Sequence, residues 1–530
     1  MSSAVAATVA TLERNDAAEM ESSREKLVNW SATHACEPQK VHRPTSTAQV
    51  LEIVSACHES GTPLRVVGSG LSPNGIAFPD EQGGGDAHVI CLEECNRVLR
   101  IDKENMLVVV EAGIQVGELL EELRDHGMTL ENLASINLQQ IGGFVQVGAH
   151  GTGATIPPVE EQVVSMKMAT PGKGEITLSA LDDDPEAFHL AKVGLGALGV
   201  MTEVTMRCVP AHRLIERVEV MTRDELRSGH AERLRSNRHV RYMWIPYEDA
   251  VVVVSSNIAA ASADIDDEED ENEDDGAAAL EPLKNLLKTC TPPGSTIPGS
   301  IGFAELRDKL LASGGGPLDT DHVVRVNAAE AEFWKRHAKA HVPKPEDSDG
   351  VLAFDCGGQQ WVWEVAMPLK SGAAVEIDFV ERILAAVESE RLPAPAPIEQ
   401  RWTRGSSAAM SPAGPDEVRG VNDALFSWVG IIMYMPSTDE EERAEITKSF
   451  KRYCDLVQNV SSQMSGAGEI PYDVQSHWAK LETEDTGPRS VGNVRRRLRR
   501  RYPVEKFNAL RRAYDPKGVM QNKKMKTWFG

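Results

Sequence analysis

Apolar side chains recur at helical and strand spacings in alternation between about residues 41 and 210. Helical spacing begins at Thr47 and recurs over residues 116–126, where Gly127 ends the pattern. Short β-branched or alternating runs predict strands over 64–67, 106–110 and 200–209. Two further runs, 166–170 and 175–178, flank the sequence Pro-Gly-Lys-Gly and predict a hairpin. The first part of the chain is therefore expected to be a mixed unit of helices and strands.

The pattern changes after about residue 213. Strand-like runs at 242–246 and 251–255 mix with amphipathic helices up to about residue 470. A Pro/Gly-rich stretch at 291–302 interrupts them, and so does the block DIDDEEDENEDD at 264–275, which should repel itself and stay disordered. This part is expected to form a second, substrate-facing domain, followed by helical segments from Arg495 to the C-terminus.

The composition is that of a soluble globular protein. The 530 residues are 41% apolar and 26% charged, which suits two to four domains with an ample core. The formal net charge of −24 argues against a nucleic-acid-binding protein and is compatible with a basic partner. No apolar run reaches the ~18 residues of a membrane span. The acidic first 25 residues show no targeting signal, since transit peptides are rich in Arg and poor in acids, so either the protein has none or the signal has been removed.

The cysteines carry little information by spacing. The eight of them form no CxxC pair and no Cys/His cluster with zinc spacing, so we expect no metal site. At this density in a long chain the thiols should be reduced. Cys356, which precedes a pair of glycines, is by default a buried and inert thiol.

A glycine- and serine-rich turn follows the predicted strand 64–67. Gly68 and Gly70 let the backbone approach a ligand closely, and Ser69 and Ser72 add hydroxyl donors. Successive exposed N–H groups in such a turn form a concavity suited to anionic oxygens. The alternative, an ordinary turn between a strand and its neighbour, is equally compatible with these residues taken alone.

A second glycine-rich segment, 142–153, holds five glycines in twelve residues and should be a poor helix interior. Together with the first turn it predicts an extended, dinucleotide-like ligand, whereas a flexible surface loop fits poorly with the apolar residues between the glycines. The sequence Gly-Leu-Gly-Ala-Leu-Gly at 194–199 matches GxGxxG, but a helix precedes it and a strand follows, which reverses the Rossmann order. It indicates a packed bend that could border the same ligand.

Candidate chemistry lies in the second half of the chain. Glu399 and Arg401 are two residues apart, so on a strand both side chains would project from one face into one cavity. A carboxylate there can orient substrate hydroxyls, and a guanidinium can stabilise developing negative charge. The alternative is a surface ion pair. His477 and Lys480 add a titratable ring and an ammonium group, although a core histidine is the simpler interpretation of His477.

These segments resemble the aldonolactone oxidoreductases of the vanillyl-alcohol oxidase flavoprotein family, and within it the plant-type dehydrogenases. The resemblance runs from about Asn29 to the C-terminus and lapses at the acidic block. Its motifs are VGSGLSPNG, the Leu133-Ala134-Ser135 region, QQIGG–QVGAHGTGA, GLGALGV, WIPY, FDCGGQQW, PAPAPIEQRWT, FSWVGIIMY, HWAK and RYPVEKFNALRRAYDP.

The resemblance implies an α+β, two-domain fold of the PCMH or vanillyl-alcohol oxidase type with a cap domain. It divides the chain into a lead-in (1–35), an FAD-binding domain (36–212), a cap or substrate domain with a disordered acidic insert at 262–276 (213–480), and a C-terminal segment that completes the FAD-binding domain (481–530).

The resemblance also implies a noncovalent FAD. Many relatives attach the flavin through a histidine at the position of Leu71, and leucine cannot form that bond. Relatives that react with oxygen tend to carry glycine at the position of Ala134, so its methyl group favours a dehydrogenase. The residues expected to bind the cofactor are Val67, Gly68, Ser69, Gly70, Leu71, Ser72, Asn74, Ala134, Ser135, Gly142, Gly143, Gly148, His150, Gly151, Thr152 and Gly199.

The implied reaction is hydride transfer from C2 of galactono-1,4-lactone to flavin N5, followed by tautomerisation to ascorbate. Glu399 would hold the substrate hydroxyls, Arg401 would stabilise the reduced flavin, His477 and Lys480 would lie close by, and Cys356 would be an oxidation-sensitive thiol. The implied electron acceptor is cytochrome c, and the implied location is the mitochondrial inner membrane, on the intermembrane-space side. Two alternatives are an oxygen-using gulonolactone or arabinonolactone oxidase and a role in the assembly of respiratory complex I.

Overall fold

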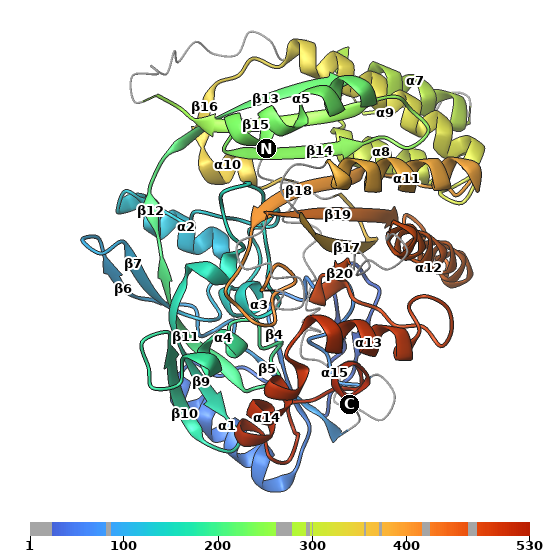
Figure 1. Ribbon diagram of the computed structural model, residues 1–530. Coiled ribbons are helices and arrows are strands. Elements are labelled where there is room, and N and C mark those ends of the chain that lie inside the picture. The colour runs from blue at the N-terminus through green and yellow to red at the C-terminus, as the bar shows by residue number, and fades with distance from the viewer. Residues whose placement is uncertain are drawn as a thin grey trace.

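The computed structural model describes residues 24–80, 86–260, 278–292, 297–298, 300–354, 357–369, 374–415, 425–464 and 474–530. The acidic insert expected at 262–276, residues 1–23 of the lead-in and Cys356 lie outside these ranges. Within them the chain forms two stacked units, with the C-terminal helices beside the N-terminal half (Figure 1).

The lower unit in Figure 1 contains a parallel and an antiparallel sheet. The parallel sheet has the order β3-β5-β4, and the antiparallel sheet has the order β10-β9-β11-β7-β6. The strands are β3 (Lys40–His42), β4 (Leu64–Val67), β5 (His88–Cys91), β6 (Val98–Asp102), β7 (Leu107–Glu111), β9 (Val163–Thr170), β10 (Gly174–Ser179) and β11 (Val200–Arg207). The expected hairpin is the β9–β10 pair. Two short pairs, β1 (Leu27–Val28) with β2 (Ala35–Cys36) and β8 (Met128–Thr129) with β12 (Val209–Pro210), lie outside these sheets.

The first helix of this unit has a clear cap at each end. The Ser46 side chain caps α1 (Thr47–Ser60) by accepting from the Gln49 N–H, and Gly61 ends it with φ = +73°. The other helices here are α2 (Val116–Asp125), α3 (Ile141–Gln146), a 3₁₀ turn (Val159–Gln162) and α4 (Pro185–Ala191).

The second glycine segment begins with a short helix. Gly142 and Gly143 lie inside α3, although five glycines in twelve residues predicted a poor helix interior. Both occupy the first turn, where backbone N–H groups need no partner within the helix. A Cβ on Gly142 would lie 3.1 Å from the Ala112 carbonyl oxygen, so close packing against β7 and its following turn explains the glycine.

The upper unit is built on one antiparallel sheet with the order β16-β13-β15-β14-β18-β19-β17-β20. Its strands are β13 (Arg213–Met221), β14 (His239–Trp244), β15 (Val251–Ile258), β16 (Pro345–Asp347), β17 (Gln360–Leu369), β18 (Ile398–Arg404), β19 (Leu425–Tyr434) and β20 (Gln475–Ser476). The helices are α5 (Arg223–Ser236), α7 (Glu281–Cys290), α8 (Phe303–Leu311), α9 (Thr320–Ala340), α10 (Ser348–Leu352), α11 (Val375–Ser389) and α12 (Glu440–Gln463).

The two faces of this sheet have different partners. Trp363 and Val365 of β17 pack into a core shared with α11 and α12. Because side chains alternate along a strand, Val362 and Glu364 point to the opposite face, toward the lower unit. The site described below lies on that second face.

The C-terminal segment returns to the lower unit. It comprises a 3₁₀ turn (Trp478–Lys480), α13 (Val491–Arg501), α14 (Val504–Tyr514) and α15 (Lys523–Phe529). Phe507 and Trp528 share one hydrophobic core with Val50 of α1 and Phe144 of α3. The buried Arg65 guanidinium donates to the carbonyls of Met520 and Ile76, which joins this segment to β4.

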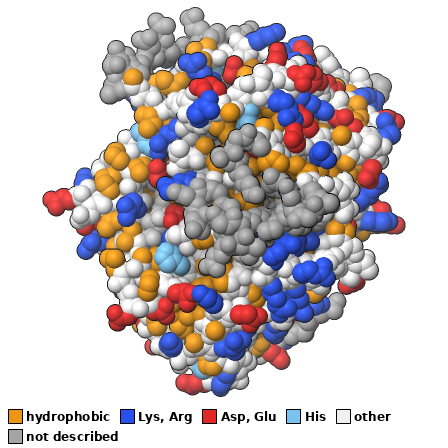
Figure 2. Space-filling view, in the orientation of Figure 1, with side chains coloured by type: hydrophobic (Ala, Val, Ile, Leu, Met, Phe, Trp, Pro, Cys, Tyr) orange, Lys and Arg blue, Asp and Glu red, His pale blue; other side chains and the backbone are white. Residues whose placement is uncertain are grey.

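Charge is distributed unevenly along the chain and over its surface. Residues 489–530 carry fourteen Lys and Arg against two acidic residues, in a chain of net charge −24. Lys and Arg side chains gather over α13 in the view of Figure 2. Across the described ranges, no helix combines the length and apolarity needed to cross a membrane.

Candidate active site

An elongated cavity of about 400 Å³ runs between the two units. One wall is the turn 68–72 together with α3 and the bend at 195–199, and the opposite wall is the inner face of the eight-stranded sheet. The cavity therefore joins both glycine-rich segments to Glu399 and Arg401. The sequence-predicted residues that line it are Val67, Gly68, Ser69, Gly70, Leu71, Ser72, Ala134, Ser135, Gly142, Gly143, His150, Gly199, Glu399, Arg401, His477 and Lys480.

Four of the expected cofactor-binding residues do not line this cavity. Asn74 turns away and donates through Nδ2 to the carbonyls of Trp478 (2.8 Å) and Leu481 (2.9 Å). Thr152 donates to the Val240 carbonyl oxygen, which ties the glycine segment to β14. Gly148 has φ = +67°, and a Cβ on Gly151 would lie 2.1 Å from the Leu133 carbonyl oxygen. These residues shape the backbone around the cavity.

The glycine turn offers free hydrogen-bond donors. Within the described part of the chain, the backbone N–H groups of residues 69–72 donate to no protein acceptor. The Ser69 hydroxyl donates to the Leu138 carbonyl oxygen and so holds the turn against the segment before α3. A Cβ added to Gly143 would meet no atom within 4 Å and would enter the cavity. Such a cradle fits the pyrophosphate of an extended dinucleotide.

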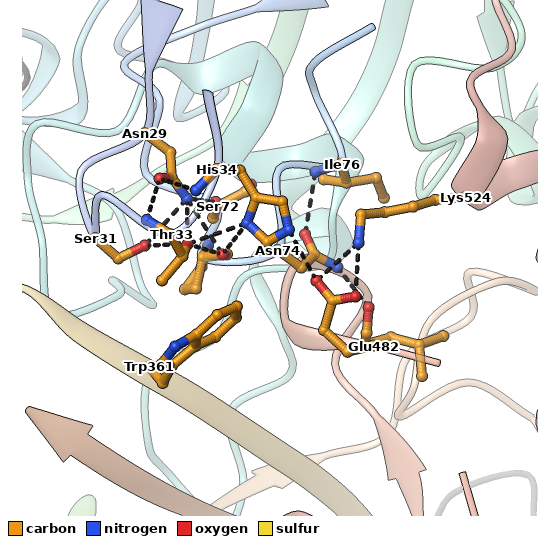
Figure 3. A network of polar contacts seen from close by, with 12 residues as sticks. Asn29, Ser31, Thr33, His34, Ser72, Asn74, Ile76, Trp361, Glu482 and Lys524 are labelled. Carbon is orange, nitrogen blue, oxygen red and sulfur yellow. Dashed lines mark hydrogen bonds and ion pairs between the residues drawn. The ribbon is translucent and has the colours of Figure 1, made fainter. Parts of the chain in front are cut away.

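A polar network braces this turn from behind (Figure 3). Asn29 accepts through Oδ1 from the N–H of His34 (3.0 Å) and donates through Nδ2 to the Ser72 carbonyl (3.0 Å). His34 Nε2 lies 3.3 Å from Glu482, and Glu482 accepts from Lys524 at 2.6 Å. The N-terminal segment, the glycine turn and the C-terminal segment thus meet at one point.

Register across the sheet sets the geometry at the other end of the cavity. Gly430 of β19 lies opposite Glu399 of β18 on one side and opposite Glu364 of β17 on the other. A Cβ on Gly430 would lie 3.7 Å from Glu364 Oε1. The missing side chain leaves a gap between the two carboxylates, and Arg401 reaches through it.

Glu364 is the centre of a buried ionic network. Its Oε1 accepts from Arg401 Nη2 at 2.7 Å, and its Oε2 accepts from Lys480 Nζ at 2.5 Å. His150 Nε2 lies 3.0 Å from Oε2, and the His150 ring stacks on Trp428 with centroids 3.6 Å apart. Three separate chain segments therefore each direct a side chain onto one carboxylate.

The network controls protonation at this site. Burial by itself would raise the pKa of Glu364, but the charges of Lys480 and Arg401, together with the His150 contact, outweigh burial and hold the pKa well below its usual range. Burial, reinforced by Lys480, lowers the pKa of His477 well below that of a free histidine. Glu364 is therefore ionised and His477 neutral near pH 7.

Glu399 is held less tightly than Glu364. Its nearest cations are Arg401 Nη2 at 3.3 Å and Arg241 Nη1 at 3.9 Å, and its side chain is 18% exposed. The Arg241 guanidinium is held in turn over the Phe354 ring at 4.0 Å. Compared with Glu364, Glu399 thus keeps more capacity to accept hydrogen bonds from a bound molecule.

His150, Glu364 and His477 bring three potential metal-ligand atoms within 4.8 Å of one another. Both oxygens of Glu364 already accept from cationic side chains, and those cations would repel a metal ion. We therefore interpret the cluster as an ionic network.

Sequence reasoning missed Glu364, Arg241 and Gly430. One signal was available for Glu364, because it interrupts the run Trp-Val-Trp-Glu-Val-Ala-Met of a buried strand, and a charge in such a strand must be paired. Arg241 and Gly430 acquire their roles only from the pairing of β14, β18, β19 and β17.

Comparison with known proteins agrees with this geometry. The family described as an FAD binding domain matches residues 38–179, and the family described as D-arabinono-1,4-lactone oxidase matches residues 204–291 and 323–528. A mitochondrial L-galactono-1,4-lactone dehydrogenase of Oryza sativa subsp. japonica is 42% identical, over 94% of this chain and 83% of that protein. The Arabidopsis thaliana enzyme of that name is 41% identical, over 94% and 80%.

More distant relatives share the full length. L-gulonolactone oxidase of Bos taurus is 26% identical, over 94% of this chain and 96% of that protein. Among solved structures, cholesterol oxidase from B. sterolicum superimposes with a TM-score of 0.75 over 96% of this chain and 97% of that chain. At 15% identity that likeness concerns the fold alone, and with the FAD binding domain it confirms the expected two-domain α+β architecture.

Proposed function

The chain belongs to the FAD-dependent aldonolactone oxidoreductases, and we propose that it is a dehydrogenase that oxidises L-galactono-1,4-lactone at C2 and passes the electrons to cytochrome c. Bound FAD would supply the hydride acceptor. We further propose a mitochondrial location, in keeping with the names of the plant relatives.

One observation supports the proposal most strongly. A single cavity connects a turn with free N–H donors to a wall that carries Glu399, Arg401 and Lys480. The N–H donors of the turn suit the phosphates of a dinucleotide, and the charged side chains of the opposite wall suit the hydroxyls of a lactone. The residues present therefore fit both FAD and its reducing substrate.

The FAD is expected to be noncovalent, because Leu71 lies at the turn and has no nucleophilic atom. The residues that would hold it are the 69–72 backbone, Ser135, Gly142 and Gly143. Ala134 also lines the cavity, and its methyl group supports the choice of dehydrogenase over oxidase.

The other end of the cavity would bind and orient the lactone. Glu399 accepts hydrogen bonds from the substrate hydroxyls, since its own ion pairs are long (3.3 and 3.9 Å). Arg401, Lys480 and Arg241 outnumber the two carboxylates there, which favours negative charge as the C2 hydroxyl loses its proton. His477 Nδ1 accepts from the Ala479 N–H, so the neutral ring carries its proton on Nε2 and acts as a donor.

The net charge of −24 is complementary to a basic electron acceptor such as cytochrome c. The charge predicts a salt-sensitive rate of electron transfer.

Two measurements test this function. Acid precipitation of the purified protein should release yellow FAD into the supernatant, and a colourless protein would contradict the assignment. Galactonolactone should then reduce cytochrome c under air with little hydrogen peroxide, whereas a stoichiometric peroxide yield would identify an oxidase. If a Glu399→Ala variant lost this activity but still supported respiratory complex I, an assembly role would be separate from catalysis.

A further inference from the structure

The cavity extends past Glu399 into a lobe that the proposed reaction at C2 does not use. We call it the distal lobe; it lies between α8, α9 and the end of β19. The residues that line it are Phe303, Ala304, Arg307, Glu330, Trp334 and Tyr434. The α8 helix falls between the two matched ranges of the lactone oxidase family, 204–291 and 323–528. The α8 side of the lobe is therefore outside the part of the chain that matches that family, whereas Glu330, Trp334 and Tyr434 lie within the second range.

Glu330 has no exposed surface and incomplete partners. Its Oε1 accepts from Trp334 Nε1 at 3.3 Å and lies 3.7 Å from Arg307 Nη1. Its Oε2 is buried and has no hydrogen-bond partner among the described residues. Burial raises the pKa of this carboxyl, and Arg307 and the indole N–H only partly oppose that shift. A buried oxygen without a partner is costly, and a ligand hydroxyl would supply what it lacks.

Arg307 is fixed by aromatic rings beside this carboxyl. Its guanidinium lies 4.4 Å from the Tyr434 ring centroid and 5.1 Å from that of Phe303. The lobe thus combines a carboxyl, a guanidinium and aromatic faces. These are groups that suit a polyhydroxylated carbon chain, with polar atoms for its hydroxyls and rings for its C–H surface.

The lobe is aligned with the reacting end of the cavity. Tyr434 is four residues beyond Gly430 on the same face of β19, and Gly430 lies opposite Glu399. At the rise of a strand, the backbones of Gly430 and Tyr434 are about 13 Å apart. The lobe and the reacting end therefore lie along one face of β19, within the same cavity.

We propose that Glu330, with Arg307 and Trp334, forms a distal subsite that binds the hydroxyls of the lactone's exocyclic carbon chain and so selects substrates by the length of that chain. The inference rests on the proposed lactone dehydrogenase function and adds the recognition of the substrate's far end. Glu330 Oε2 pairs with a chain hydroxyl, and the adjacent Arg307 can donate to a second.

Two lactones test the subsite: six-carbon L-galactono-1,4-lactone, which carries an exocyclic chain, and a four-carbon aldono-1,4-lactone, which carries none. Glu330→Gln keeps the shape but removes the charge. We expect kcat/KM for the six-carbon lactone to fall by about tenfold, and kcat/KM for the four-carbon lactone to change by less than about twofold. Glu332→Gln, on the outer side of the same helix and paired with Arg336, is the matched control and should change neither.

Ala304→Leu is a second variant that leaves the buried pair intact. Ala304 is half-buried at the lobe, so added methyl groups should fill the space and weaken equilibrium binding of a nonreactive 2-deoxy six-carbon lactone, measured by calorimetry. The subsite would be overturned if Glu330→Gln lowered kcat/KM equally for both lactones, or if Ala304→Leu bound the 2-deoxy lactone as tightly as the unmodified protein does. Failure of the unmodified protein to oxidise either lactone would instead contradict the proposed function.

Discussion

Arg401 on β18 reaches past β19 to donate to Glu364 on β17 at 2.7 Å. The contact is possible because Gly430, opposite Glu364 in register, leaves the intervening space free. The guanidinium also lies 3.3 Å from Glu399, so its position beside that carboxylate depends on a buried partner two strands away. This arrangement leads to the first prediction.

The size of the side chain at position 430 should control activity. The Cβ of Gly430→Ala would lie in ordinary contact with Glu364 Oε1 (3.7 Å), so activity within about threefold of the unmodified protein is expected. Gly430→Leu should occupy the gap, displace Arg401 and lower kcat/KM with galactonolactone by roughly a hundredfold. Steady-state kinetics at equal FAD content tests this, and an active Leu variant would show that the contact is dispensable.

Glu399→Gln should separate catalysis from stability. The side chain is partly exposed and its ion pairs are long, so we expect the free energy of unfolding to change by less than about 1 kcal/mol. Activity with the lactone should nevertheless fall by at least about tenfold, because a charged acceptor for the substrate hydroxyls is lost. Urea unfolding and turnover on one preparation provide both numbers, and a fully active variant would remove Glu399 from the site.

Glu364→Gln should reduce both activity and stability. Removing one partner of a buried ionic network leaves Lys480 and Arg401 without their counter-charge, at a cost of about 3 kcal/mol. Urea unfolding at pH 7 measures this cost. Glu364→Asp is the control that keeps the charge and should lose less stability.

The same carboxyl predicts a pH dependence. The pKa of Glu364 is lower in the folded state than in the unfolded state, so it contributes stability above about pH 4.3, and this contribution is lost as the pH falls through the folded-state pKa. Acidification below about pH 4.3 should therefore destabilise the unmodified protein more than the Gln variant. Parallel acid-induced unfolding curves for the two proteins would contradict this assignment.

The bracing network behind the glycine turn should affect FAD retention. Asn29→Ala removes the donor to the Ser72 carbonyl and the acceptor for the His34 N–H (Figure 3). We expect faster release of FAD on dilution, with the turnover per bound FAD unchanged, because the substrate end of the cavity is untouched. Flavin fluorescence after dilution measures the release. Asn105→Ala, in an exposed turn, is the matched control and should release FAD at the original rate.

Local patterns in the sequence determined a large part of this protein. The turn after β4, the β9–β10 hairpin, the limits of α1 and the common face of Glu399 and Arg401 follow from glycine conformations, capping and strand alternation, which act over a few residues. The motifs also identified the family and its cofactor correctly.

Only the tertiary structure decided which segments meet. Alternation along β17 shows that Glu364 shares a face with Val362, but it does not reveal that β19 lies between β17 and β18, or that Gly430 stands opposite both carboxylates. Long-range packing also decides that Asn74 and Thr152 lie outside the cavity and that Glu330 lines it. Periodicity fixes the direction of a side chain within its element, whereas the neighbours it finds depend on long-range packing of the whole chain.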